Sequence, residues 1–463
     1  MKLPQTKRVV KRVVKRVEQF VTGPAALLVC GVALELCLIG IALAGDLRPQ
    51  IHLLWALGFP AFVCYGVAGW RAVRTSQGHG LRQILVFAII FRLTMLCASP
   101  NLSDDVYRYL WDGRVQLAGG NPYQHAPDSP ALTDLRDDEL YPPINHKQIR
   151  TIYPPVAQLF FAAVCLIDPS VLFMKIALVG CEMAMLFVLL KILALRGLSS
   201  ERLLLYAWNP LAILEIAGSG HVDALAVTLL LGAIYLLLLG RNHAGVALLG
   251  TAVLSKLVPL LAVPLFWRRL AGCNTTTPTA WLSLQGKLAM IWLPVVLVAG
   301  YAIYSGAGAS HILDGLSVYL MKWRFNDGLF TLVYELLRKP GLPWDDDALE
   351  QAWVVCSLAL VGVALLTLIR VPDTLRAAFI LLAAHLLLSP TVHPWYLLWV
   401  LPFLPFFPNI GWLYLSAATL LAYNVLDGFH ATGEWHEDAW VKWVQYAPFA
   451  ILMALPRLTK RTR

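Results

Sequence analysis

Long apolar runs dominate the chain, and short polar segments separate them. Runs such as Ala25–Ala44, His52–Trp70 and Val171–Leu190 have the roughly 20 residues that a helix needs to cross a bilayer. The pattern therefore predicts an all-α, polytopic integral membrane protein with about 12–14 transmembrane helices. No internal repeat and no soluble domain is visible, so residues 1–463 are expected to form a single membrane domain.

Several later runs are short or interrupted. Ala244–Leu254 and Leu257–Trp267 are each short for a span, and Lys256 separates them, which predicts a helical hairpin with Lys256 at its outer tip. Short spans are tolerated where protein or a water-filled cavity surrounds them. The remaining crossings are expected at Leu85–Ala98, Leu203–Ala217, Ala224–Leu239, Leu288–Gly306, Ala352–Ile369, Ala377–Leu388, Trp395–Phe407, Trp412–Val425 and Val441–Leu455.

The composition agrees with a membrane protein. Apolar residues make up 58% of the chain and charged residues 14%, against about 45–50% and 25% in soluble domains. These values exclude a cytosolic enzyme, a secreted disulfide scaffold and a disordered protein. The eight cysteines include no CxxC pair and no Cys/His cluster, so neither a zinc site nor a disulfide framework is indicated.

The distribution of charge predicts the orientation. Residues 1–20 contain the repeat KRVVKRVVKRV, which is typical of a basic amphipathic helix on the cytoplasmic, anionic leaflet. Basic residues also end the chain, so both termini are expected to be cytoplasmic. Segment 100–153 holds eight acidic residues against five Lys or Arg, which places it on the outer face, and 307–351 forms a second outer loop. Because the basic residues flank spans, no nucleic-acid partner is expected.

Four polar clusters that are far apart in the sequence fall at the outer face: Asp104–Asp105, His221–Asp223, Lys256 and His393. Ionisable groups at membrane depth are costly and generally mark functional sites. Their convergence on one face indicates a site there.

The first cluster predicts a short helix capped by Ser103 in the first outer loop. Asp104 and Asp105 then have two interpretations. They are a helix cap with a local Asp104–Arg108 pair, or one of them is a general base that takes a proton from a hydroxyl. The choice between Asp104 and Asp105 stays open, with Asp105 slightly favoured. Helical spacing places Asp105, Tyr109 and Asp112 on one face, and Asp104, Arg108 and Trp111 on the next.

The other clusters also have structural interpretations. Gly218–Asp223 is compatible with an ordinary turn, Lys256 with a snorkelling lysine, and His393 with an interfacial belt. The functional interpretation starts from location. Nucleotide sugars are cytoplasmic, and the chain has no Gly-rich phosphate loop. A transferase at the outer face therefore needs a donor from the membrane, such as a polyprenyl-phosphate sugar, whose phosphate Lys256 and His393 would bind electrostatically.

Four segments carry a resemblance: SDDVYRYLWDGRV with GGNPY, AWNPLAILEIAGSGHVDALAV, LSKLVPLLAVPLF and SPTVHPWYLLWVLPF. In order and spacing they resemble the C-type (GT-C) membrane glycosyltransferases, in particular the bacterial polyprenyl-phosphate-mannose-dependent mannosyltransferases. The resemblance covers about residues 90 to 430. It implies a helical first outer loop and an inverting transfer of a hexose, with mannose favoured, to a hydroxyl acceptor.

The resemblance also assigns residues. Asp104 or Asp105 takes the base position, and Lys256 and His393 lie near the donor phosphate. His221 and Asp223 border the sugar or acceptor, and we place Arg108, Tyr109 and Asp112 with them. No cofactor is expected, although the Asp104–Asp105 pair leaves a divalent cation conceivable.

The alternative is a lipid-linked sugar flippase or transporter, which would also use broken helices and buried charges. Two features argue against it: the halves show no internal symmetry, and the charges gather at one face. The expected location is the bacterial inner membrane, with the site on its extracytoplasmic side. The expected partners are membrane lipid, a polyprenyl-phosphate sugar and a glycolipid or glycan acceptor whose identity the sequence does not fix.

Overall fold

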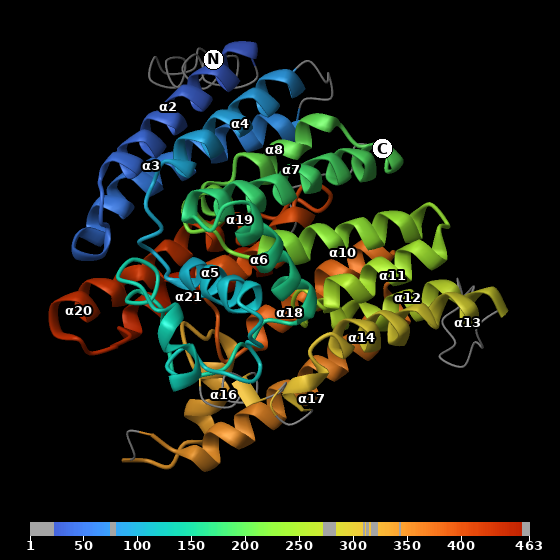
Figure 1. Ribbon diagram of the computed structural model, residues 1–463. Coiled ribbons are helices and arrows are strands. Elements are labelled where there is room, and N and C mark those ends of the chain that lie inside the picture. The colour runs from blue at the N-terminus through green and yellow to red at the C-terminus, as the bar shows by residue number, and fades with distance from the viewer. Residues whose placement is uncertain are drawn as a thin grey trace, which may run out of the picture.

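The computed structural model describes residues 23–74, 80–271, 284–308, 311, 314–315, 323–341 and 344–455. Over these ranges the protein is all-α, which confirms the predicted class (Figure 1). Extended pairing within them is limited to an isolated bridge between Phe325 and Thr391. The basic segment 1–20, expected to be an amphipathic helix, lies outside the described residues, as does part of the second outer loop, 307–351.

Among the described residues, five helical segments are long and apolar enough to cross a membrane, so the protein is a polytopic membrane protein. The expected number of spans, about 12–14, stays a prediction because the other apolar helices are short or bent. The long segments are α2 (Pro24–Leu43), α3 (Ile51–Arg74) with the preceding turn η1 (Arg48–Gln50), α7 (Val171–Leu195), α13 (Leu284–Met290) with α14 (Trp292–Ala302), and α17 (Asp346–Arg370).

The shorter helices complete the bundle. In the first half they are α4 (Leu81–Leu96), α5 (Asp105–Leu117), α6 (Pro155–Ile167), α8 (Leu204–Ala207), α9 (Pro210–Ile213), α10 (Asp223–Leu238), α11 (Asn242–Val253) and α12 (Val263–Leu270). In the second half they are α16 (Leu329–Leu337), α18 (Thr374–Leu388), α19 (Ile410–Ala418), α20 (Asn424–Thr432) and α21 (Ala439–Ala454). Single turns are η2 (Pro130–Leu135), η3 (Ser200–Leu203), η4 (Leu214–Gly218), η5 (Val258–Ala262), η6 (Ser305–Ala307), η7 (Pro394–Trp399), η8 (Leu401–Phe403) and η9 (Thr419–Tyr423).

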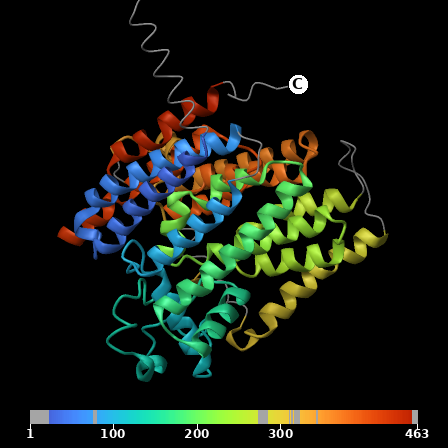
Figure 2. The same cartoon turned by 90° about the horizontal axis from the view of Figure 1, so that it is seen from above.

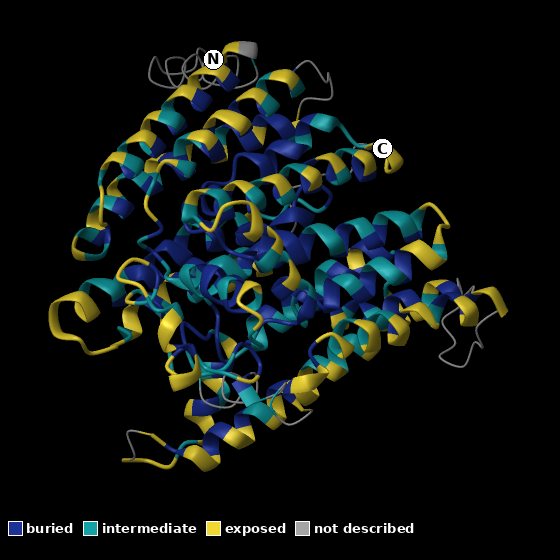
Figure 3. Ribbon diagram, viewed as in Figure 1, coloured by how far each residue is buried: buried dark blue, intermediate teal, exposed yellow. Residues whose placement is uncertain are grey.

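The helices pack as neighbouring groups around a buried centre. Helix α2 packs on α3 and α4, while α10 packs on α7 and α11, and α11 on α14 (Figures 1 and 2). Helices α5 and α6 pack on each other and on α7, and α6 also contacts α14. Buried residues concentrate in the middle of the bundle, whereas α2 and α17 expose much of their apolar surface, as helices facing lipid would (Figure 3).

Two segments differ from the expected spans. Trp395–Phe407 forms the short 3₁₀ turns η7 and η8 in place of a long helix. Pro394, Pro402 and Pro405 explain this, because a proline cannot donate in the α-helical hydrogen-bond ladder. Conversely, α6 is a 13-residue apolar helix where the apolar pattern predicts no crossing. It follows segment 100–153 directly and packs against α5.

Charged side chains within the bundle are compensated by an opposite charge or by backbone carbonyl groups. The Arg92 guanidinium donates to both carboxylate oxygens of Glu182, at 2.9 and 2.6 Å, and both side chains are fully buried. Lys175 of α7 donates to the carbonyl oxygens of Met95, Leu96 and Ala98 at the end of α4. Carbonyl groups at the end of a helix lack the N–H partners of the regular ladder, so Lys175 fixes the point at which the chain leaves α4 for α5.

Helix α5 meets α6 at a glycine. A Cβ atom on Gly113 would lie 2.6 Å from Cys165 Sγ and 2.7 Å from the Phe161 carbonyl oxygen. The backbone of α6 therefore occupies the space that any other side chain would need. This close approach sets the position of α5, and with it the direction of Asp104 and Asp105 at its start.

We expect Gly113→Ala to destabilise the protein by about 1–3 kcal/mol, because a methyl group cannot enter this contact without moving one of the two helices. Thermal unfolding in detergent measures the change. Gly180→Ala is the matched control, since Gly180 lies in α7 with open space where a methyl group would be added, and it should leave the unfolding temperature unchanged or raise it. Equal unfolding temperatures for the two variants would contradict the packing argument.

Candidate active site

The candidate site forms around a break between two helices. The segment Pro210–Gly218 and helix α10 are bent by 117° at the turn that contains His221. The turn starts from η4, a π-helical turn in which the Ser219 N–H donates to the Leu214 carbonyl, at 2.8 Å. Gly220 has a φ of +79°, a conformation that favours glycine, and it closes the turn. The side chains of Glu215 and His221 are thereby held in the protein interior.

Three ionisable groups lie in a row at this break. His221 Nδ1 is 3.6 Å from Asp105 Oδ2, and His221 Nε2 is 3.3 Å from Glu215 Oε2. The hydroxyl of Tyr423 donates to Glu215 Oε1 at 2.6 Å. His221 and Glu215 are fully buried, whereas 30% of the Asp105 side chain is exposed. Asp105 is therefore the member of the row that an external molecule can reach.

The protonation states follow from this row. Burial alone would lower the pKa of His221, but the two neighbouring carboxylates outweigh it and raise the pKa to about 9. Burial raises the pKa of Asp105, but the hydrogen bond and charge of His221, with smaller effects of His393 and Lys256, bring it below the ordinary value. At neutral pH the turn thus holds an imidazolium beside an ionised Asp105.

Lys256 and Asp223 form a second pair. Lys256 Nζ lies 2.7 Å from both carboxylate oxygens of Asp223, and the Trp399 indole N–H donates to the same carboxylate at 2.7 Å. Asp223 is buried, while 21% of the Lys256 side chain is exposed. Lys256 Nζ also lies 4.8 Å above the Tyr396 ring. The exposed side of this ammonium group remains available to an anion, and Asp223 faces its buried side.

An aromatic stack connects His221 to His393. Trp395 lies parallel to both imidazoles, with ring centres 3.9 Å from His221 and 4.3 Å from His393. Phe325 packs against His393 at 4.8 Å. Burial lowers the pKa of His393 to about 3, so this imidazole is neutral near pH 7. A neutral imidazole can offer a phosphate an N–H group, and the expected place of His393 near the donor phosphate stays a prediction.

The remaining predicted residues lie on α5. Asp104 does not pair with Arg108 as one interpretation predicts; it binds Arg48, at 2.5 Å, because α5 directs it toward η1. Arg108 instead pairs with Asp112, at 2.9 Å. The other Asp112 oxygen accepts from the Gln158 amide, at 2.8 Å.

Tyr109 is also buried on α5. It stacks on Phe161, with ring centres 4.6 Å apart, and the backbone N–H of Val222 approaches its hydroxyl at 3.5 Å. Tyr109 and Asp112 thus hold α5 against α6 and the turn, and their expected contact with sugar or acceptor stays a prediction.

The two neighbouring aspartates differ in their surroundings. Burial raises the pKa of Asp104 despite the Arg48 charge, whereas the pKa of Asp105 is lowered beside His221. Asp105 is the one that faces the His221 turn. The structure brings Asp105, His221, Asp223, Lys256 and His393 to one place, and it leaves Asp104 on the Arg48 side.

Sequence reasoning missed several side chains of the site. Glu215 meets the criterion that identified the other clusters, because it is an acidic residue inside an apolar run. The sequence pattern alone gives it no role. Trp395, Trp399 and Tyr423 carry no such signal, because aromatic residues are common in membrane helices. His146 adopts a left-handed conformation, with a φ of +49°, and its ring packs at a tilt against Trp323, with ring centres 4.3 Å apart.

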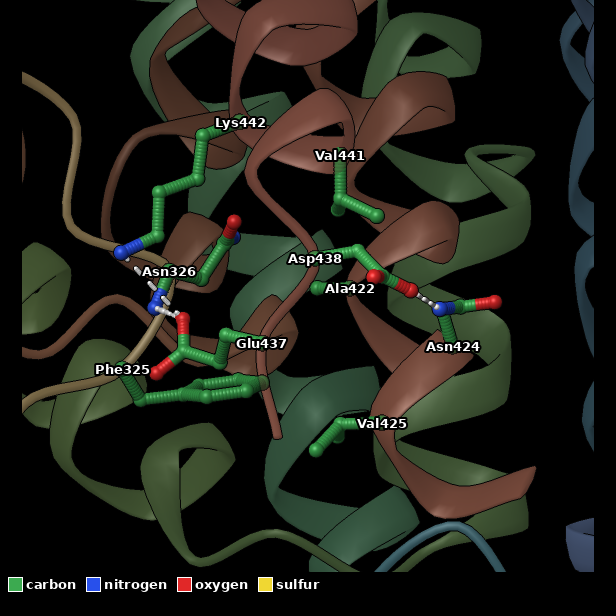
Figure 4. A pocket seen from close by; sticks show the side chains of 9 residues that line it. All are labelled: Phe325, Asn326, Ala422, Asn424, Val425, Glu437, Asp438, Val441 and Lys442. Atoms are coloured by element: carbon green, nitrogen blue, oxygen red, sulfur yellow. Dashed lines mark hydrogen bonds and ion pairs between the residues drawn. The ribbon is translucent and has the colours of Figure 1, made fainter. Parts of the chain in front are cut away.

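A small pocket lies beside the aromatic stack (Figure 4). The backbone N–H of Asn326 donates to Glu437 at 2.7 Å, and the Asn424 amide donates to Asp438 at 2.7 Å. The first bond fastens the segment next to Phe325, which packs on His393, to the residues before α21, and the second joins those residues to α20. The lining residues of the pocket are Phe325, Asn326, Ala422, Asn424, Val425, Glu437, Asp438, Val441 and Lys442.

The sequence leaves metal binding open for Asp104 and Asp105. In the described part of the chain, no group of three or more His, Cys, Asp or Glu side chains is arranged to hold a metal ion. The two aspartates bind different cations of the protein, Arg48 and His221. The donor set in the structure thus consists of separate ion pairs.

Fold and site together define a polytopic membrane protein with an ionised carboxylate in a cluster of charged and aromatic side chains. The family model for "Alpha-(1->6)-mannopyranosyltransferase, N-terminal domain" (the MptA_B family) matches residues 22–271, more than half of the chain. The chain belongs to this family and is an α-mannosyltransferase of the GT-C type. A search of curated proteins finds no match. Asp105, His221, Asp223 and Lys256 lie within the matched residues.

Lys256→Met should lower the free energy of unfolding by about 3–5 kcal/mol, because it leaves the buried Asp223 carboxylate without its cation. Adding Asp223→Asn removes that uncompensated charge and keeps an acceptor for Trp399, so the double variant should unfold at a higher temperature than Lys256→Met alone. Thermal unfolding of wild type, both single variants and the double variant checks this. Additive losses would show that the two side chains are not coupled.

Proposed function

We propose that the protein transfers mannose from a polyprenyl-phosphate mannose to a sugar hydroxyl at the outer face of the bacterial inner membrane, with inversion at the anomeric carbon and with Asp105 as general base. The observation that carries the proposal is the position of Asp105: half-buried, ionised and directed at the turn where His221, Asp223, Lys256 and His393 meet. The family description specifies an α-(1→6) linkage, so the acceptor oxygen we propose is the 6-hydroxyl of a sugar.

The reaction balances with these groups. The acceptor oxygen attacks C1 of mannose while Asp105 takes the hydroxyl proton. The new O–C1 bond forms as the bond between C1 and the phosphate oxygen breaks, and the electron pair leaves with polyprenyl phosphate. Attack opposite to the leaving group inverts C1, so a β-linked donor gives the α-mannoside that the family description names. The proton then passes from Asp105 to water.

Lys256 is the residue we propose for the donor phosphate. Its ammonium group is partly exposed and is held from behind by Asp223 and Trp399, so it needs little rearrangement to face the charge that grows on the leaving phosphate. The neutral His393 is proposed to add an N–H donor. The lipid chain would lie against the apolar surfaces that the bundle exposes. The acceptor we propose is a glycolipid or glycan.

Asp105→Asn should reduce mannosyl transfer by about 10²–10⁴-fold, because the amide cannot accept the hydroxyl proton. Purified protein in detergent, polyprenyl-phosphate mannose and a membrane glycolipid extract make up the assay. Asp104→Asn is the matched control: it makes the same change one residue earlier, in a carboxylate that binds Arg48, and should keep most of the activity.

Full transfer by Asp105→Asn with loss in Asp104→Asn would move the base to Asp104. A parallel reaction with a nucleotide mannose as donor tests the source of the sugar, and transfer from it alone would overturn the lipid-linked donor. Wild-type protein that moves lipid-linked sugar across proteoliposomes without transferring it would overturn the proposed function itself.

A further inference from the structure

Glu215 lies at the site without a part in the reaction described above. Its carboxylate is fully buried in η4, one turn before His221. One oxygen accepts a hydrogen bond from the hydroxyl group of Tyr423, at 2.6 Å. The other oxygen lies 3.3 Å from His221 Nε2, an ion-pair distance, and makes no hydrogen bond within the described structure. A buried carboxylate is costly to keep ionised, so its position beside a histidine calls for a reason.

The row Asp105, His221 and Glu215 favours one protonation state. A neutral imidazole carries one N–H group and would turn a lone pair toward one of the two carboxylates. An imidazolium presents an N–H group to both. The charge on His221 therefore also holds its ring in one orientation, with Nδ1 toward Asp105.

The parallel ring of Trp395 restricts the imidazole further, because at 3.9 Å it covers one face of His221. Rotation of the imidazole out of the row would break this stacking and separate two carboxylates from their shared cation. Glu215 is thus joined to Asp105 through a side chain that has little freedom to move.

We propose that Glu215 is a positioning residue, which together with Tyr423 keeps His221 protonated and turned toward Asp105 during glycosyl transfer. Glu215 does not touch the reacting atoms in this proposal; it acts through His221. The inference rests on the proposed function in that Asp105 is taken as the base.

Several other groups near His221 bear on its charge. His393, on the other face of Trp395, and Lys256, across the turn, both interact electrostatically with Asp105. His393 also interacts electrostatically with His221. The titratable groups that face the row from the packed elements are Asp105 and Tyr109 of α5 with Asp104 at its N-cap, His146 and Tyr153 before α6, Glu215 of η4, Asp223 of α10, Lys256 before η5, His393 before η7 and Tyr423 of η9.

Glu215→Gln tests the proposal with little change in shape. The amide keeps an acceptor for Tyr423 but presents an N–H group or a neutral oxygen to His221, so the imidazolium loses one of its two anions. In wild type, kcat/KM should stay level through neutral pH and fall only above a pKa of about 9. In Glu215→Gln the same alkaline fall should begin at least about one pH unit lower, because Asp105 alone then raises the pKa of His221 against its burial. In either protein, kcat/KM should drop about tenfold per pH unit above the pKa of His221.

Tyr423→Phe should give a smaller shift in the same direction, because it removes one hydrogen bond and leaves the charge of Glu215. Glu35→Gln is the control: it neutralises another carboxylate on an apolar helix, one bonded to Thr94, and should leave the pH profile unchanged. A uniform loss of activity in Glu215→Gln with the wild-type pH profile would indicate a merely structural role and overturn the inference. Absence of transfer by wild type would instead overturn the proposed function.

A second measurement does not need activity. An imidazolium in contact with an indole quenches its fluorescence, so the difference in emission between wild type and Trp395→Phe reports the charge of His221. The difference should titrate near pH 9 in wild type. On the Glu215→Gln background it should titrate at least about one pH unit lower, a shift large enough to be a tenfold change in proton affinity. His393, the other imidazole on Trp395, titrates near pH 3 and does not interfere. Coincident titrations in the two backgrounds would refute the role of Glu215.

Discussion

Charged side chains between apolar helices need an opposite charge or several hydrogen-bond partners within a few ångströms, because removing an uncompensated charge from water costs several kcal/mol. In this protein that requirement joins segments far apart in sequence. Arg92 of α4 meets Glu182 of α7, and Lys256 meets Asp223 of α10. Asp105, His221 and Glu215 form the third set. The first pair holds the bundle, whereas the other two hold the candidate site. One physical constraint therefore organises both the packing of helices and the chemistry between them.

The site depends equally on breaks in the helices. Pro210, the π-helical turn η4 and the left-handed Gly220 bend the chain by 117°, which places His221 and Asp223 at a protected break. On the C-terminal side, closely spaced prolines convert an apolar run into 3₁₀ turns, and these carry Trp395 and Trp399 to the same break. Irregular backbone at membrane depth is tolerated where protein surrounds it. Here the irregular backbone directs its polar side chains into the site, whereas a regular helix would direct them against neighbouring helices.

Much of the fold followed from the sequence. Apolar length predicted the all-α membrane class, and the motifs around Asp105, His221, Lys256 and His393 predicted segments that do converge. The pairings did not follow. Asp104 turns to Arg48, and Lys256 to Asp223, because such choices depend on helix rotation and approach that a single sequence does not encode locally. The neutral state of His393 was missed for the same reason: it results from burial by Phe325 and Trp395. The aromatic partners Trp399 and Tyr423 had no distinguishing pattern at all.

The residues matched by the family end at 271, but the row at the break does not. Tyr423 binds Glu215, Trp395 covers His221, and Trp399 binds Asp223, all from beyond that limit. The site is therefore built from both the matched residues and the remainder of the chain. A substitution in the N-terminal part that alters Glu215 or Asp223 changes what the C-terminal part must supply. The site that the matched half carries is therefore completed by three aromatic side chains of the second half of the chain.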